Sequence, residues 1–125
     1  MSTLLEQLAT GSVLLSDGAT GTYLQEHGLE PGGCPELMND THPEVVGQMA
    51  ANYFAAGSNM VETNSFGGSR YMLAKYDLGD RVEELNCKGA ELARQAAPAG
   101  CYVLGSIGPT GEFLEPNGTA TEEAM

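Results

Sequence analysis

The sequence predicts an α/β fold made of three consecutive βα units. Three short apolar runs each end in a polar, glycine-containing turn, and the run tips at Asp17, Glu62 and Ser106 recur at nearly equal intervals. The segments between the tips have helical periodicity. Because helices that join parallel strands make right-handed crossovers, we expect the three turns at the same carboxyl-terminal edge of the sheet. That edge is where α/β enzymes place their chemistry.

The first βα unit follows a short lead-in helix. Leucines at helical spacing predict this helix over residues 2–9, and Gly11 ends it. The apolar run 13–15 predicts a strand buried on both faces, which leads into the turn that begins at Asp17. A second short helix is expected over residues 20–27.

The second unit has the clearest helix signal. Thr41 and Glu44 fit a capping box, so we expect a helix to begin at Thr41. Apolar residues then recur with a period of 3.6 as far as Phe54, and Gly57 ends the helix. A short strand over residues 59–62 follows.

The third unit contains two predicted helices, over residues 69–76 and 80–97, and a strand over 102–106. A second capping-box pattern over 119–122 predicts the start of another helix. The sequence ends at Met125, so we expect the chain to stop inside this element.

Three parallel strands would leave two long unpaired edges and a partly uncovered apolar face. A complete (β/α)8 barrel needs about 250 residues. We therefore expect residues 1–125 to form one unit, the amino-terminal part of an incomplete (β/α)8 TIM barrel.

Composition excludes several classes of function. Five basic and seventeen acidic residues give a formal net charge of -12, which disfavours nucleic acid and anionic lipid as partners. No apolar run approaches the roughly 18 residues of a membrane span. The first residues lack the basic and apolar regions of a signal peptide. We expect a cytoplasmic protein.

The cysteines Cys34, Cys87 and Cys101 are widely spaced and form no metal-binding motif. Cys87 and Cys101 are expected to be buried structural residues. Cys34 lies in a glycine-rich loop and is the one cysteine whose reactivity merits a test. No metal ligand and no catalytic residue is assigned.

Candidate binding residues follow the first strand. Asp17 places a carboxylate at the strand tip, and Gly18 and Ala19 behind it let backbone amides approach a ligand. The Asp17 carboxylate could bind the ammonium group of a ligand, and the backbone amides could bind its carboxylate. An amino acid carries both groups. The alternative is that Asp17 only caps the turn.

The second tip carries Glu62, Thr63 and Asn64, whose polar groups can orient a substrate. Glu62 has an alternative structural role, because it can form an internal ion pair with Arg70 or Lys75.

Four motifs in this order resemble the homocysteine S-methyltransferase family. They are Asp17-Gly18-Ala19-Thr20-Gly21-Thr22, Pro43-Glu44-Val45-Val46, the run from Ala56 to Gly67, and Gly105-Ser106-Ile107-Gly108-Pro109-Thr110-Gly111. The family includes the homocysteine-binding module of cobalamin-dependent methionine synthase and betaine-homocysteine methyltransferase. The resemblance spans nearly the whole chain and implies a (β/α)8 barrel.

The resemblance also implies an activity. A zinc ion held by three cysteine thiolates would bind the homocysteine sulfur as a thiolate, which attacks the methyl group of a donor of the methylcobalamin, betaine or S-methylmethionine type. A corrinoid is thus a possible methyl donor. In this picture Asp17 binds the substrate ammonium and the amides of Gly18 and Ala19 approach its carboxylate. Thr63 and Asn64 would shape the same pocket.

The sequence departs from the family pattern in one respect, because the adjacent Cys-Cys pair of the family's zinc site is absent. The chain is therefore expected to need the remainder of the barrel, or a complementing chain, for activity. Two alternatives remain open. One is a non-catalytic amino-acid-binding or split-barrel partner module, and the other is a different barrel enzyme that uses Asp17 and Glu62 as an acid–base pair.

Overall fold

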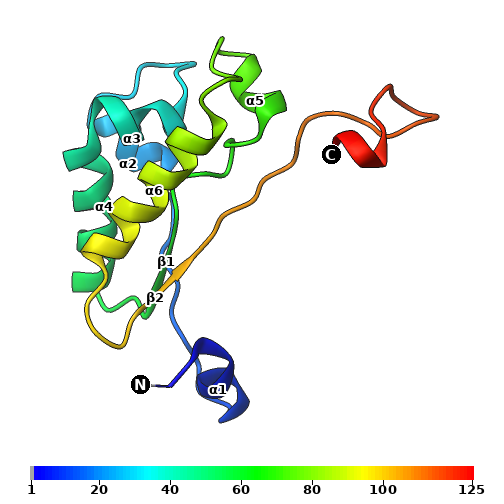
Figure 1. Ribbon diagram of the computed structural model, residues 1–125. Helices are drawn as coiled ribbons and strands as arrows, with labels where there is room; N and C mark the ends of the chain where they lie inside the picture. The colour runs from blue at the N-terminus through cyan, green and yellow to red at the C-terminus, as the bar shows by residue number, and fades with distance from the viewer. Residues whose placement is uncertain (1) are drawn as a thin grey trace.

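The computed structural model describes residues 2–125. The first residue of the predicted unit 1–125, Met1, lies outside the described residues. The α/β class is confirmed, and most helices gather on one side of a thin sheet (Figure 1). In chain order the elements are α1 (Leu4–Ala9), α2 (Gly21–Glu26), the 3-10 helix η1 (Pro35–Leu37), α3 (Met38–Thr41), α4 (Pro43–Ala55), β1 (Met60–Glu62), α5 (Arg70–Ala74), α6 (Val82–Ala96), β2 (Tyr102–Leu104) and the 3-10 helix η2 (Glu122–Ala124).

The sheet consists of two parallel strands, β1 and β2, with Val61 opposite Val103. Helices α5 and α6 lie between them in the chain and form the crossover that a parallel pair requires. The predicted second and third strands are thus present.

The first predicted strand is only partly formed. Residues 13–15 approach β1, and the carbonyl of Leu15 accepts a hydrogen bond of 3.3 Å from the amide of Met60. Pairing with β1 is limited to a single parallel bridge between Ser16 and Met60. Val13 is 96% exposed, so this segment buries little apolar surface and has a neighbour on one side only. The prediction of three strands is corrected to two strands and one bridge.

Helices α4 and α6 cover one face of the sheet and pack against each other. Val61 of β1 is fully buried between them, in a cluster with Ala50 and Phe54 of α4 and Ala93 of α6. Burial of such side chains is the main favourable contribution to folding. A second cluster joins α2, α3 and α4 through Leu24, Met38, Val46 and Met49.

The start of α4 differs from the predicted capping box. Thr41 is the last residue of α3, and its hydroxyl donates to the carbonyl of Leu37 at 3.2 Å. His42 is the N-cap residue of α4, and Pro43 follows at its first position. The proline explains the break, because the residue before a proline is pushed out of the helical region. His42 accordingly has a φ of -138°.

The second predicted capping box is also wrong, because the cap lies two residues later in the chain than predicted. Thr121, not Thr119, is the N-cap residue, and its side chain accepts a hydrogen bond from the amide of Ala124. The element it begins is the 3-10 helix η2, a single turn.

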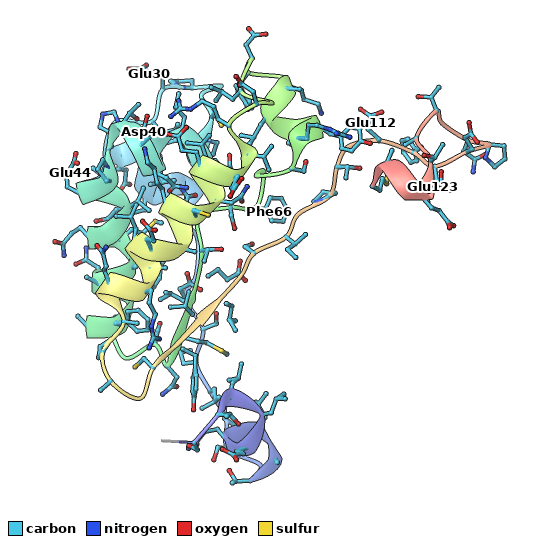
Figure 2. The ribbon with its side chains drawn as sticks, in the orientation of Figure 1. Glu30, Asp40, Glu44, Phe66, Glu112 and Glu123 are labelled. Atoms are coloured by element: carbon cyan, nitrogen blue, oxygen red, sulfur yellow. The ribbon has the colours of Figure 1, made fainter. Side chains whose placement is uncertain are left out.

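Several large apolar side chains are exposed. Val13, Leu15, Phe66 and Ile107 lie in segments next to the strands, whereas Phe113 and Leu114 lie in the carboxyl-terminal tail. Phe66 points from the helical layer toward the side on which the carboxyl-terminal tail extends (Figure 2). At the amino ends of the strands, α1 is attached through the hydroxyl of Tyr102, which donates to the carbonyl of Ser2 at 2.9 Å. None of the described helices is long and apolar enough to cross a membrane.

Candidate functional site

The three predicted strand tips lie together at one edge of the sheet. The carboxylate of Asp17 accepts a hydrogen bond of 3.1 Å from the backbone N–H of Glu62. The carboxylate of Glu62 in turn accepts a bond of 2.9 Å from the hydroxyl of Ser106. The expectation that the three turns share the carboxyl-terminal edge is therefore confirmed.

Asp17 is half-buried, and both of its carboxylate oxygens already accept one hydrogen bond. Oδ2 accepts from the Glu62 amide, and Oδ1 accepts from the hydroxyl of Ser16 at 3.0 Å. A carboxylate oxygen can accept more than one such bond, so acceptor capacity remains. Gly18 and Ala19 behind it are exposed, and among the described residues no hydrogen bond from their backbone N–H groups is found.

Tyr53 of α4 is a neighbour of this turn that the sequence did not single out. Its hydroxyl donates to the carbonyl of Ala19 at 2.5 Å. A Cβ on Gly18 would lie 3.4 Å from the hydroxyl oxygen of Tyr53. Tyr53 lies within the predicted apolar run that ends at Phe54. The available signal was chemical, because a hydroxyl on such a face needs a hydrogen-bond partner.

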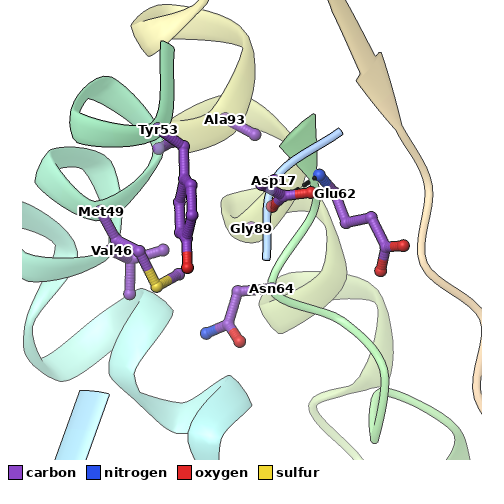
Figure 3. A pocket seen from close by; sticks show the side chains of 9 residues that line it. Asp17, Val46, Met49, Tyr53, Glu62, Asn64, Gly89 and Ala93 are labelled. Carbon is purple, nitrogen blue, oxygen red and sulfur yellow. Dashed lines mark hydrogen bonds between the residues drawn. The ribbon is translucent and has the colours of Figure 1, made fainter. Parts of the chain in front are cut away.

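A small cavity separates the Asp17 turn from the helical layer (Figure 3). Asp17, Tyr53 and Asn64 contribute its polar side chains, and residues of α4 and α6 contribute the apolar ones. Its volume is about 10 Å³, room for roughly one water molecule and too little for an amino acid. A ligand at the strand tips would therefore have to approach from the uncovered side of the sheet.

Thr63 and Asn64 follow Glu62 and are both buried. The hydroxyl of Thr63 accepts a hydrogen bond of 3.0 Å from the amide of Ser106 and lies 2.6 Å from the hydroxyl of Ser65. The side-chain amide of Asn64 donates to Asn39 Oδ1 at 2.9 Å. Both side chains are thus engaged within the protein, and their predicted contact with a substrate stays a prediction.

The structure also bears on the ion pair considered for Glu62 and on the surroundings of the cysteines. Among residues 2–125, Glu62 forms no salt bridge with Arg70 or Lys75. Cys34, the cysteine proposed for a reactivity test, is buried, and burial raises the pKa of its thiol, which lowers the thiolate fraction. The cysteine at the surface is Cys87, so its predicted burial is wrong.

Glu36 is a buried acidic residue that sequence reasoning missed. It is 4% exposed, and its Oε1 accepts a hydrogen bond of 2.6 Å from the amide of Gly67. The thiol of Cys34 donates to its Oε2 at 3.4 Å. No periodic pattern or spacing in the loop marks this residue, and only its tertiary contacts reveal it.

Comparison with known proteins identifies the family. A family model described as homocysteine S-methyltransferase matches residues 14–125. The chain belongs to this family. The resemblance drawn from the four sequence motifs is thereby confirmed.

Two methionine synthases are similar to this member of the homocysteine S-methyltransferase family. The protein of Mycobacterium tuberculosis (strain H37Rv) is 42% identical over 111 residues, which are 78% of this chain and 9% of that protein. The protein of Mycobacterium leprae is 41% identical over 120 residues, 85% of this chain and 10% of that protein. The chain thus spans about a tenth of the length of these relatives.

Solved structures of a related enzyme share the fold. The homocysteine methyltransferase MmuM from Escherichia coli, in its oxidised form, superposes with a TM-score of 0.74 at 27% identity over 88% of this chain and 42% of the other. Its metallated form gives a TM-score of 0.72 at 27% identity, over 86% and 42% of the two chains. The fold that carries the strand tips of this chain is therefore shared with part of a homocysteine methyltransferase.

The residues of this homocysteine S-methyltransferase chain do not fit a zinc site by themselves. Within the described part, no three His, Cys, Asp or Glu side chains are grouped closely enough to hold a metal ion. Cys34 is buried beside Glu36, Cys87 is exposed on α6 and Cys101 precedes β2, so the three thiols belong to different surroundings.

Proposed function

We propose that this chain supplies part of the homocysteine pocket of an S-methyltransferase, which moves a methyl group from an activated donor to the homocysteine sulfur and forms methionine. The observation that carries the proposal is the row of strand tips, with the half-buried carboxylate of Asp17 beside two exposed backbone amides. Family membership over residues 14–125 supports the reaction class.

In this proposal Asp17 binds the ammonium group of homocysteine. An ammonium bound to the carboxylate would add charge-assisted hydrogen bonds to the two that Asp17 already accepts. The amides of Gly18 and Ala19 would donate to the substrate carboxylate. Thr63 and Asn64 would shape the pocket wall.

The uncovered sheet face would be occupied by the remaining strands and helices of a (β/α)8 barrel, with residues 1–125 as its amino-terminal part. The E. coli homocysteine methyltransferase supports this occupant, because this chain matches 42% of it at a TM-score of 0.74. Two unpaired strand edges and exposed residues such as Val13 and Ile107 would then be buried. The remaining barrel would come from the same polypeptide or from a complementing chain.

Zinc is part of the proposal for the complete domain only. Its ligands would lie outside residues 2–125, since the described side chains do not group around a metal. The methyl donor would be of the methylcobalamin, betaine or S-methylmethionine type. The similarity to methionine synthases favours the corrinoid donor among these.

A chimaeric enzyme tests the proposal. Residues 14–125 would replace the matching segment of the Mycobacterium tuberculosis methionine synthase, which is 42% identical to this chain. We expect the chimaera to form methionine from homocysteine. A folded chimaera that takes up zinc but neither binds nor methylates homocysteine would contradict the proposal.

Asp17→Asn in the chimaera tests the ammonium contact. Asparagine keeps an oxygen that can accept from the Glu62 amide but loses the negative charge. Because hydrogen bonds to charged groups contribute about 1.5–3 kcal/mol, KM for homocysteine should rise by roughly ten- to a hundredfold. Asp80→Asn, at an exposed position, is the control and should leave KM unchanged. An unchanged KM for Asp17→Asn would remove this residue from the pocket, and full retention of activity would count against the acid–base alternative as well.

The second candidate function is a non-catalytic module that binds an amino acid. It would need only groups within residues 2–125, because the carboxylate of Asp17 and the amides of Gly18 and Ala19 suit the two charged ends of an amino acid. Calorimetry of the 125-residue chain with homocysteine and with methionine separates the two functions. Micromolar binding by the chain alone favours the module, whereas binding only after the remaining barrel is added favours the enzyme.

A further inference from the structure

Two buried polar side chains lie close together on the short segment from Pro35 to Asn39. Glu36 is 4% exposed and Asn39 is 2% exposed. Glu36 lies in η1 and Asn39 in α3, three positions apart, so their side chains project from the same side of a helical turn. Burial of a carboxylate without a cation and of an amide is costly unless both are hydrogen-bonded. Each therefore requires an explanation.

Both side chains are bonded to the loop that follows β1. The amide of Asn39 donates to the carbonyl of Asn64 at 2.8 Å, and Asn64 donates back to Asn39 Oδ1 at 2.9 Å. The side chain of Asn64 also donates to the carbonyl of Pro35 at 2.8 Å. Glu36 accepts from the amide of Gly67 at 2.6 Å. Four hydrogen bonds thus join residues 35–39 to residues 64–67.

Two glycines make room for these contacts. A Cβ at Gly89 of α6 would lie 2.7 Å from Asn39 Nδ2 and 3.1 Å from the carbonyl of Asn64. A Cβ at Gly67 would lie 3.0 Å from Glu36 Oε1. A side chain at Gly89 would force Asn39 to shift, and one at Gly67 would be in tight contact with the carboxylate of Glu36.

We propose that Glu36 and Asn39 are positioning residues, which hold the 64–67 loop in the conformation that the substrate pocket needs. They touch no substrate. They act through Asn64, a predicted pocket residue, and through Gly67, which follows the exposed side chain of Phe66. The four hydrogen bonds between residues 35–39 and residues 64–67 are called the clamp. The role of the clamp in the pocket rests on the proposed function, whereas its existence does not.

Hydrogen exchange of the full 125-residue chain tests the clamp. In Glu36→Ala the protection of the Gly67 amide should fall by roughly ten- to a hundredfold, because a buried bond to a charged acceptor is lost. Amides of α4 and α6 should keep their protection. Glu36→Gln retains a side-chain oxygen and should restore much of the protection at Gly67. The control Glu44→Gln, at an exposed position, should change nothing.

The outcomes separate the clamp from the proposed function. Unchanged protection at Gly67 in Glu36→Ala, or an equal loss throughout α4 and α6, would overturn the clamp. Kinetics of the chimaera provide the second readout, in which Glu36→Ala and Asn39→Ala should raise KM for homocysteine more than they lower kcat. Local loss of protection with an unchanged KM would keep the clamp but reject its role in the pocket. A chimaera that is inactive with native Glu36 and Asn39 would instead count against the proposed function alone.

Discussion

Gly47 and Gly89 each lie inside a helix, but their surroundings differ. Gly47 lies within α4, and a Cβ there would meet only Leu92 Cδ2 at 3.9 Å, an ordinary contact. Gly89 lies within α6 against the buried side chain of Asn39. Glycine costs helix stability at both positions, but only at Gly89 does the tertiary structure require it.

Alanine at the two positions should have opposite effects. Gly47→Ala should stabilise the chain by about 0.5–1 kcal/mol, because alanine restricts the unfolded chain and fits the helix. Gly89→Ala should destabilise it by about 1–3 kcal/mol, because the new methyl group overpacks a closed junction. Urea denaturation followed by circular dichroism measures both. Equal effects in the same direction would show that helix propensity, not packing against Asn39, governs Gly89.

The sequence predicted the position of Asp17 in the site, but it did not reveal the residues that support the site from a distance in the chain. Asp17 was recognised because a carboxylate at the end of an apolar run, followed by glycines, is a local pattern, and the structure does put it beside Glu62. Glu36 and Asn39 were missed because their partners lie far away in the sequence and no local pattern marks them. Tyr53 was missed although its hydroxyl on an apolar helix face indicates that it needs a hydrogen-bond partner.

At the scale of elements, four charged residues connect the α3 region to the start of α6. Arg81 and Lys88 both bind Asp40, at 2.8 and 2.5 Å, and both also bind Glu84, at 2.8 and 2.9 Å. Hydrogen bonds from Arg81, and then from Lys88, lower the pKa of Glu84 to about 2. Lys88, and then Arg81, lower the pKa of Asp40. These partly exposed pairs are subject to screening by solvent and salt.

The lowered pKa values predict the direction of a pH effect. A carboxylate whose pKa is lower in the folded chain than its ordinary 4.5 stabilises the fold above that pH, and the contribution is lost as the pH falls toward about 2. Glu84→Gln should therefore lower stability near neutral pH and flatten its decline between about pH 4.5 and about 2. Urea denaturation over this range measures the effect, with the exposed Glu44→Gln as the matched control. If Glu84→Gln and Glu44→Gln declined in parallel, the network would make no net contribution.

At the scale of the whole molecule, the helical layer covers one face of the sheet and leaves the other without a described partner (Figure 1). Val13, which precedes the bridge to β1, is 96% exposed, and Ile107, which follows β2, is 94% exposed. Unpaired parallel strand edges and exposed apolar side chains favour association with another chain. The net charge of -12 opposes that association but does not remove the apolar surface.

The isolated 125-residue chain should therefore self-associate, and the double variant Val13→Lys, Ile107→Lys should reduce this. Lysine on an exposed edge disfavours edge-to-edge contact. Sedimentation velocity at several protein concentrations measures the association. The double variant Gln48→Lys, Gln95→Lys, at exposed positions of α4 and α6, adds the same two charges and controls for the change in net charge. A native chain that stays monomeric at all concentrations would show that the open face needs no covering.

The sequence by itself determined the α/β class, the approximate positions of β1, β2 and the helices other than η1 and α3, and the family. These follow from local patterns, namely periodicity, turn residues and short motifs, which act over a few neighbouring residues. The tertiary structure alone decided that the first predicted strand is reduced to one bridge, between Ser16 and Met60. It also decided that Glu36 and Asn39 are buried against the 64–67 loop. Burial and pairing depend on segments that meet only when the chain folds, so they cannot be read from any one stretch of the sequence.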